Sequence, residues 1–266
     1  MGKYIYTYIE NGQMYDKSPS FADLLAKEGL SCEKIVTGRI DYISVEDFSE
    51  KIKDAQWIVL TSKNAVAGFV YNMGGRDGEG VPNCDDALNC DSVRAAGVGC
   101  ELSAGVRIAV VGKKTQEALI MACGLEADFV SFQATGMELG KSLKNIAAGK
   151  IVYLCAEVTS GSLEEAMKDY SELVKIPVYR NEYVDTYAEY GNKDYSDVSG
   201  IVVTSGSSGE RVKWLIDKLG EVPVYSIGPA CSRKLVEAGV KEWRIIEAQE
   251  HSYSGLVDMI KKSAGR

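Results

Sequence analysis

The chain repeats one strand-loop-helix plan twice, and this internal repeat restricts its fold more than any other sequence feature. A buried strand ending in Thr-Ser occurs at Trp57–Ser62 and again at Gly200–Ser205. A strand, a glycine and a helix then follow at Arg107–Leu119 and at Pro223–Leu235. The period is too long for a solenoid, so the repeat indicates domain duplication. We therefore expect two α/β lobes with any ligand between them.

Short β-rich apolar runs alternate with helical patterns along the chain, which indicates βαβ units and a mainly parallel sheet. We expect strands at 4–9, 34–38, 57–61, 107–111, 128–132, 151–155, 174–180, 201–204, 222–227 and 243–247. Helical patterns, several beginning at a Ser, Thr or Asn cap, lie at 20–28, 46–53, 63–72, 114–123, 136–147, 162–170, 207–219, 230–238 and 253–263.

Length and charge narrow the classes of protein that fit. At 266 residues the chain favours two domains over one. No apolar run approaches the ~20 residues that span a bilayer, and the start, MGKYIYTYIENG, does not resemble a signal peptide. We therefore expect a cytoplasmic protein without membrane contact. The net charge of -8 argues against a nucleic-acid partner, because such binding needs a basic surface.

The first repeat carries an extra stretch at 73–106, rich in glycine, aspartate and asparagine, which we interpret as an inserted surface loop. Its Cys84, Cys90 and Cys100 could be taken for a metal cluster. Structural zinc prefers paired ligand spacing, and here no CxxC pair or histidine accompanies the cysteines. Free thiols are the favoured interpretation, and we expect no metal site.

Six segments carry short motifs along the chain: Ile58–Val66, Ile108–Thr115, Pro177–Arg180, Ile201–Ser207, Tyr225–Pro229 and Ser252–Leu256. Together they resemble the uroporphyrinogen III synthase family, in that family's order and over nearly the whole chain. Each motif alone is weak, so the specificity comes from their combination, order and duplication.

The resemblance implies an α/β fold of two flavodoxin-like parallel-sheet domains that are interleaved in sequence. Residues 1–33 plus 185–266 would form a discontinuous first domain, and 45–173 the second. Segments 34–44 and 174–184 would form a two-stranded antiparallel bridge between them, and their β-rich, polar-interrupted composition suits that role. Such a bridge can flex, so lobe closure is the expected motion.

The family cyclises hydroxymethylbilane, a linear tetrapyrrole octacarboxylate, with loss of water and inversion of the last ring. The resemblance therefore implies a lyase of tetrapyrrole (heme, siroheme or cobalamin) biosynthesis, with no cofactor, and we expect a monomer. Because the substrate closes unaided to the uninverted isomer, the enzyme must mainly control conformation and assist departure of the hydroxyl.

Carboxylates need hydrogen-bond donors, which helix N-termini at the carboxyl ends of parallel strands can supply. Plain N-capping uses the same residue types and is the favoured alternative for any single Ser or Thr. The candidate substrate-binding residues are Thr61, Ser62, Lys63, Gly112, Lys113, Lys114, Thr135, Thr204, Ser205, Ser207, Gly228, Cys231 and Ser252.

Tyr179 matches the family's tyrosine that is the usual candidate to protonate the departing hydroxyl. A phenol with a pKa near 10 is protonated at neutral pH, although a strand tyrosine packed between lobes is an equal alternative. The only histidine, His251, is interpreted as a solvated loop residue rather than a base. Cys231 is interpreted as a substitution, although a helix N-terminus can activate a thiol as a nucleophile.

Three departures from the family pattern remove contact groups. Ala230 and Cys231 follow Gly228-Pro229 where the family commonly has two threonines, Cys155-Ala156-Glu157 stands where many members have Pro-Arg-Gly, and the first strand ends in Tyr8-Ile-Glu-Asn without the frequent arginine. They keep a second hypothesis open, a non-catalytic tetrapyrrole-binding or regulatory module. A nucleotide-binding enzyme would need a Walker loop or a GxGxxG after a strand, and both are missing.

Overall fold

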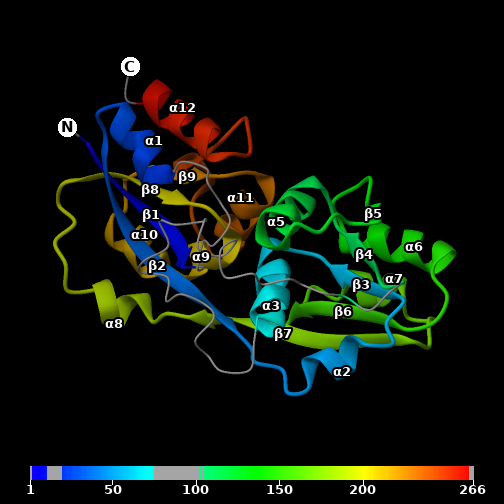
Figure 1. The fold of residues 1–266 in the computed structure, drawn as a ribbon. Helices are drawn as coiled ribbons and strands as arrows, with labels where there is room; N and C mark the ends of the chain where they lie inside the picture. The colour runs from blue at the N-terminus through cyan, green and yellow to red at the C-terminus, as the bar shows by residue number, and fades with distance from the viewer. Residues whose placement is uncertain (1, 11–19, 75–101, 103–104, 264–266) are drawn as a thin grey trace. The chain divides into compact units, whose positions relative to one another are not determined.

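The structure is a computed structural model that describes residues 2–10, 20–74, 102 and 105–263. Its strands and helices alternate along the chain (Figure 1). By internal contacts the described residues divide into two compact units. Unit 1 takes them from Met1–Glu10, Lys17–Arg39 and Glu182–Arg266, and unit 2 from Ile40–Asn181. The expected α/β class with a mainly parallel sheet is confirmed.

Unit 1 has the strand order β10-β9-β8-β1-β2, with parallel pairing throughout. The strands are β1 (Lys3–Glu10), β2 (Ser31–Tyr42), β8 (Val198–Val203), β9 (Val224–Ser226) and β10 (Ile245–Glu247). The helices are α1 (Phe21–Lys27), α8 (Thr186–Tyr190), α9 (Gly206–Arg211), α10 (Lys213–Lys218), α11 (Pro229–Glu237), the 3-10 helix η2 (Glu242–Arg244) and α12 (Tyr253–Ser263).

Unit 2 has the order β7-β6-β3-β4-β5, again with parallel pairing. The strands are β3 (Trp57–Leu60), β4 (Arg107–Val110), β5 (Phe129–Val130), β6 (Ile151–Ala156) and β7 (Leu173–Tyr183). The helices are α2 (Phe48–Ile52), α3 (Lys63–Met73), α5 (Lys113–Cys123), α6 (Gly136–Ile146) and α7 (Ser162–Ala166).

The strands of each unit have an apolar cluster on both faces, which explains why the central strands are continuous apolar runs. In β3, Ile58 and Leu60 belong to one cluster of unit 2, whereas Trp57 and Val59 belong to the other. The alternation follows from the two-residue period of a strand. The central strands are therefore anchored from both faces, and they hold the loops at their carboxyl ends in place.

Strands β2 and β7 both run from one unit into the other and are neighbours in the strand order. Their hydrogen bonds run from the Val184 N–H to the Thr37 carbonyl and from the Ile43 N–H to the Val178 carbonyl. One residue number falls as the other rises, so the two strands run antiparallel.

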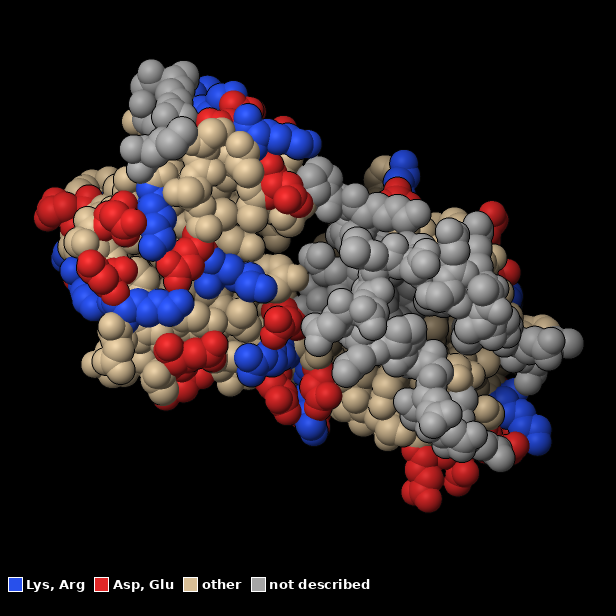
Figure 2. All heavy atoms as spheres, turned by 60° about the vertical axis from the view of Figure 1, so that its left-hand side comes forward, with Lys and Arg blue, Asp and Glu red and all other residues tan. Residues whose placement is uncertain are grey.

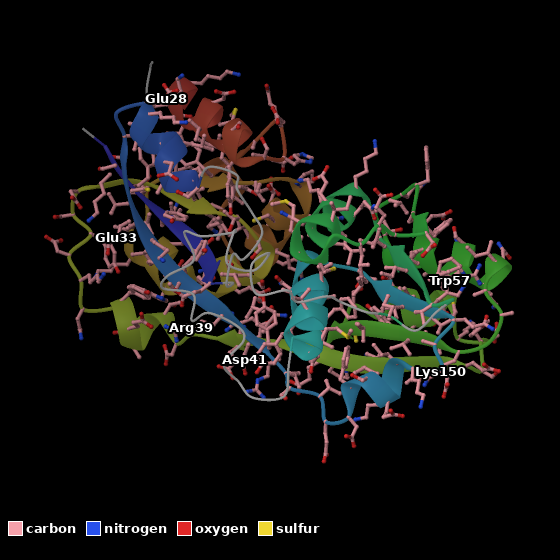
Figure 3. The ribbon with its side chains drawn as sticks, viewed as in Figure 1. Glu28, Glu33, Arg39, Asp41, Trp57 and Lys150 are labelled. Atoms are coloured by element: carbon pink, nitrogen blue, oxygen red, sulfur yellow. The ribbon has the colours of Figure 1, made fainter. Side chains whose placement is uncertain are left out.

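Three charged residues of β2, Glu33, Arg39 and Asp41, form ion pairs, and Figure 3 labels their positions. Glu33 bonds Lys3 and Lys193, with oxygen-to-nitrogen distances of 3.0 and 2.7 Å. Arg39 bonds Glu10 at 3.0 Å, and Asp41 bonds Arg180 at 2.5 Å. Trp57 and Lys150, labelled in the same figure, meet at the amino end of β3, where the Lys150 carbonyl accepts the Trp57 N–H.

The observed elements correct four details of the expected pattern. The helix expected at 207–219 is two helices, because Val212 has φ -99° and ψ 14° and interrupts the α-helical backbone. The helix expected at 162–170 ends at Ala166 and continues as turns. The strand expected at 243–247 opens as η2. Helix α8 was not expected, although Asp185 is an N-cap residue that accepts the Ala188 N–H.

Most of the 73–106 stretch, with Cys84, Cys90 and Cys100, lies outside the described residues. Within the part of the chain that is described, no helix is long and apolar enough to cross a membrane. In that same part, no group of three or more His, Cys, Asp or Glu side chains is arranged to hold a metal ion.

Candidate functional site

The turn between β3 and α3 brings Ser62 to Tyr179. Ser62 is the N-cap of α3, and its oxygen accepts the Ala65 N–H at 3.0 Å. The same oxygen lies 3.0 Å from the phenol oxygen of Tyr179. The neighbouring Thr61 hydroxyl lies 3.1 Å from the Tyr153 hydroxyl. Two sequence-predicted residues of different roles, one binding and one catalytic, are therefore directly hydrogen-bonded.

Tyr179 lies in β7 beside Ala156, the last residue of β6, at an irregularity in the strand pairing. Only 9% of Tyr179 is exposed. Burial raises its pKa above the ordinary value of 10.0, against a smaller lowering by the bond to Ser62. The phenol is therefore protonated throughout the neutral range, which a proton donor requires.

A second turn of unit 2 leads from β4 into α5. Gly112 is the N-cap of α5 and has no side chain, so the first-turn N–H groups have no side-chain cap. Lys113 and Lys114 follow it on the surface. The next turn begins α6, where Thr135 is the N-cap and accepts the Glu138 N–H at 3.3 Å. The α5 turn therefore offers backbone donors, whereas the Thr135 oxygen is already used in capping.

In unit 1, the turn after β8 is built from hydroxyl groups that bond one another. The Thr204 hydroxyl donates to the Thr7 carbonyl at 3.1 Å. The Ser205 hydroxyl donates to Ser208 at 2.7 Å and accepts the Ser208 N–H, as an N-cap does. Ser207 is exposed and lies 3.3 Å from Ser205. The hydroxyl protons of Thr204 and Ser205 are thus committed within the protein.

The remaining predicted residues of unit 1 lie at the starts of α11 and α12. Gly228 is the N-cap of α11. The ring of the exposed His251 lies close to it, because a Cβ added at Gly228 would be 3.1 Å from that ring. Ser252 accepts the Gly255 N–H at 3.0 Å as a cap. Cys231 is buried, and its thiol donates to the Val203 carbonyl at 3.6 Å. Burial raises the thiol pKa, which disfavours a nucleophilic role.

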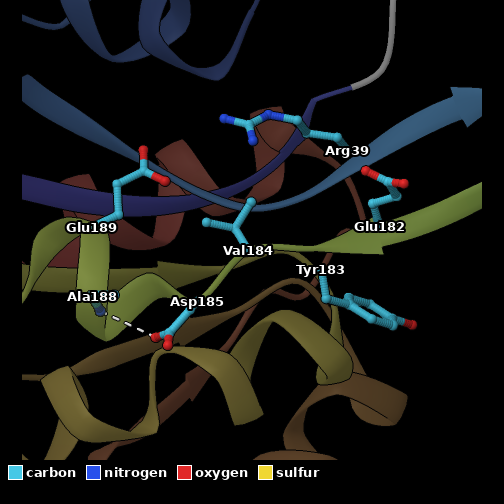
Figure 4. A pocket seen from close by; sticks show the side chains of 7 residues that line it. All are labelled: Arg39, Glu182, Tyr183, Val184, Asp185, Ala188 and Glu189. Atoms are coloured by element: carbon cyan, nitrogen blue, oxygen red, sulfur yellow. Dashed lines mark hydrogen bonds between the residues drawn. The ribbon is translucent and has the colours of Figure 1, made fainter.

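Two cavities of unit 1 contain none of the predicted site residues. One, of about 430 Å³, is lined by three carboxylates, with Arg39 and Tyr183 among its other side chains (Figure 4). Another, of about 500 Å³, has three glutamates and one arginine in its lining. Excess negative charge makes both unsuited to an anionic ligand.

The charged residues on the described surface are mixed in sign. On the face that Figure 2 shows, lysines and arginines lie among aspartates and glutamates, with no broad basic area among the described residues in view. This distribution agrees with the net charge of -8. An anionic ligand would therefore depend on local donors rather than on a long-range positive field.

The family model of uroporphyrinogen-III synthase HemD matches residues 20–258. The chain belongs to the uroporphyrinogen-III synthase family. The uroporphyrinogen-III synthetase structure from Helicobacter pylori has a TM-score of 0.62 and 13% identity, and the match covers 99% of this chain and 100% of that one. A mutant uroporphyrinogen III synthase from Thermus thermophilus has a TM-score of 0.53 and 15% identity, covering 100% and 98%. At these identities the structural matches support the fold. A comparison with curated proteins finds no match.

The three departures from the uroporphyrinogen-III synthase pattern fall at the ends of β1 and β6 and in the first turn of α11. Ala156 is buried, and the exposed Glu157 follows it. At the end of β1, Glu10 is paired with Arg39. Ala230 is exposed, whereas the thiol of Cys231 is turned into the core. These positions place little side-chain positive charge at the turns of this family member.

Sequence reasoning missed several hydroxyl groups that bond the predicted residues. Thr7, Thr37 and Ser208 are each 1% exposed, and Tyr153 is 4% exposed. Thr37 bonds Ser208 at 2.9 Å, and Ser208 in turn bonds Ser205. The sequence signal that could have indicated these residues was a threonine near the carboxyl end of an apolar strand. The hydroxyl group that bonds this threonine comes from a distant segment, which local patterns do not reveal.

Proposed function

We propose that this chain is a uroporphyrinogen III synthase that cyclises hydroxymethylbilane to uroporphyrinogen III. The reaction releases water and inverts the last pyrrole ring as the macrocycle closes. Family membership supports the assignment. The observation that carries it is the Ser62–Tyr179 hydroxyl pair at the carboxyl end of the unit 2 sheet. The scheme is that of a cyclising lyase acting as a cytoplasmic monomer, and it requires neither cofactor nor metal.

Tyr179 is the proton donor in this proposal. Loss of water breaks the C–O bond of the hydroxymethyl group with the electron pair on oxygen, and a proton delivered there makes water the leaving group. Burial keeps the Tyr179 phenol protonated until it reacts. Because the Ser62 oxygen accepts the Ala65 N–H, its hydroxyl is free to donate to the phenol oxygen and stabilise the phenolate left behind.

Backbone N–H groups are the proposed contacts for the substrate carboxylates. The hydroxyl protons of Thr204 and Ser205 are committed to internal bonds. The first turn of α5 has donors without a side-chain cap, and Lys113 and Lys114 add positive charge beside them. A helix N-terminus with these features attracts a carboxylate through the aligned peptide dipoles.

A second candidate function, tetrapyrrole binding without catalysis, has one specific observation in its favour. Cys231 is buried and bonds the Val203 carbonyl, so its side chain supplies no substrate contact. Ala156 likewise has no polar side-chain group. Backbone donors would still hold carboxylates after such losses, whereas turnover depends on more contacts.

The isomer formed from hydroxymethylbilane separates the two functions. The bilane closes unaided to the type I isomer, so type III requires an enzyme. With bilane generated in place and the purified chain present, we expect type III as the main product. Type I alone at the protein-free rate, together with measurable binding of a tetrapyrrole, would instead support the binding module.

A further inference from the structure

Phe132 is 99% exposed in the loop between β5 and α6. The backbone around it is held on both sides. The Ser131 N–H donates to the Val110 carbonyl at 3.0 Å, and the Thr135 N–H donates to the Gln133 carbonyl at 2.7 Å. The Ser131 hydroxyl also bonds the Gln133 carbonyl at 2.7 Å. The loop therefore presents a large apolar ring to solvent, which costs roughly 1.5–3 kcal/mol of burial energy that folding could otherwise have gained.

The internal repeat provides a built-in control for this loop. In unit 1, the Ala248 N–H donates to the Ser226 carbonyl at 2.9 Å, and the Ser252 N–H donates to the Glu250 carbonyl at 2.8 Å. These bonds match those of Ser131 and Thr135, and Thr135 and Ser252 both cap the helix that follows. The residue of unit 1 at the position of Phe132 is Gln249, which is exposed. The loop conformation therefore forms without an aromatic residue.

The surroundings of Phe132 are suited to an aromatic ring that carries carboxylate groups. Gly112 packs against the same loop, because an added Cβ there would lie 3.1 Å from the Ala134 Cβ. The uncapped start of α5, with the exposed Lys113 and Lys114, is therefore next to the Phe132 loop. An aromatic face beside cationic and N–H donors matches a pyrrole that carries carboxylate arms.

We propose that Phe132 is a substrate-contact residue whose ring stacks on one pyrrole of the bilane while that pyrrole's carboxylates meet the start of α5. This proposal rests on the proposed function and deepens it. Stacking holds one ring of a flexible linear substrate, and restricting that substrate's conformation is the main task of a catalyst that must select one closure over another.

Phe132→Gln installs the residue type that the other repeat uses, so folding should be unaffected. Phe132→Trp keeps an aromatic face, and Gln249→Ala is the matched control in unit 1. The quantities to be measured are the melting temperature, the steady-state formation of type III product, and the equilibrium binding of uroporphyrinogen III in the absence of oxygen. The loss of one stacking contact predicts a roughly 3- to 10-fold fall in kcat/KM, carried mainly by KM, and a similar loss of binding. Phe132→Trp should retain most of the binding and activity that Phe132→Gln loses, and Gln249→Ala should behave as the wild type.

Suppose that the wild type makes type III product and that Phe132→Gln has the same kcat/KM and the same binding as the wild type. This result would overturn the role of Phe132 and leave the proposed function standing. A wild type that binds but makes only type I would overturn the catalytic function, and the binding arm would still decide on Phe132. If sedimentation showed that Phe132→Gln abolishes a dimer while binding is unchanged, the ring would belong to an interface between copies, against this proposal.

Discussion

The phenol oxygen of Tyr179 lies 3.0 Å from the Ser62 oxygen, which also receives the Ala65 N–H at 3.0 Å. A capping oxygen that already accepts a bond is well suited to donate its own proton. Donation from Ser62 to Tyr179 leaves the phenol proton available to another acceptor. Ser62 thus acts in this account as a positioning residue, and its effect passes through Tyr179.

Replacing Ser62 with alanine removes both the cap and the partner of Tyr179. Loss of an N-cap costs about 1 kcal/mol of stability. In addition, we expect kcat for type III formation to fall roughly 10-fold with a smaller change in KM, because the phenolate loses its stabilising donor. Ser62→Thr, which keeps the hydroxyl, should restore most of the activity in the same steady-state assay.

Ser20 provides the control for this variant. It caps α1 in a capping box with Asp23 and has no predicted site role. Ser20→Ala should lose a similar amount of stability in a urea titration and keep wild-type kcat. Equal losses of kcat in the two alanine variants would show that Ser62 acts only by capping its helix.

Tyr179→Phe should lower kcat by on the order of 10- to 100-fold, near the weak end of general acid catalysis, because a phenol is a poor acid. Since the pKa of Tyr179 is raised above 10.0, wild-type kcat should show no loss from tyrosine ionisation below about pH 10. Tyr170→Phe is the matched control, because Tyr170 donates to the Gly149 carbonyl at 2.6 Å at the opposite end of the unit 2 sheet. Unchanged kcat in Tyr179→Phe would remove this residue from the mechanism.

Glu33 should make the stability of the protein depend on pH in the acid range. Its bond to Lys193 is the largest cause that lowers its pKa below 4.5, followed by burial, which acts against the shift, and by Lys3. A lowered folded-state pKa gives stability that is present above the unfolded pKa and lost as pH falls through the folded pKa.

Glu33→Gln should therefore cost up to about 1 kcal/mol in urea titrations at pH 7 and much less at pH 3. Glu50→Gln serves as the comparison, because its pair with Lys53 is exposed, with side chains 72% and 60% accessible. A Glu33→Gln penalty that is equal at both pH values would contradict the role of these ion pairs.

Gly68 is required for the close approach of α3 to β7. A Cβ at this position would lie 2.7 Å from both the Val178 carbonyl oxygen and its Cγ2. Gly68→Ala should destabilise the protein by about 1–3 kcal/mol and lower kcat, because pushing α3 away separates Ser62 from Tyr179. Gly220→Ala, whose added Cβ meets nothing nearer than 3.9 Å, should leave both quantities almost unchanged. A Gly68→Ala variant as stable as the wild type would refute the packing argument.

The sequence predicted the elements that local pattern determines. The strands at Trp57 and Ile201 could be predicted because both faces of a parallel sheet are buried. The caps Ser62, Thr135 and Ser205 could be predicted because the first N–H groups of a helix need an acceptor. The hydrogen-bonded hydroxyl pairs could not be predicted from the sequence. Tyr179 and Ser62 are 117 positions apart, and only the tertiary fold brings them together.

The misjudged helix at 207–219 has a similar origin. Its apolar spacing is continuous, yet the backbone changes conformation at Val212, which is fully buried between α9 and α10. Periodicity reports which side chains are buried and does not report where tertiary packing interrupts a helix. Cys231 illustrates the same limit for the site, because its position suggested a contact while its thiol bonds the core.

The isomer composition of the product at increasing protein concentration decides whether this chain catalyses the formation of uroporphyrinogen III. Hydroxymethylbilane is supplied at a constant rate, and types I and III are separated after oxidation to the porphyrins. We expect the type III fraction to rise with protein concentration until it is the main product, and we expect Tyr179→Phe to require more protein to reach the same fraction. Type I alone at every concentration of the folded wild-type chain would contradict this expectation.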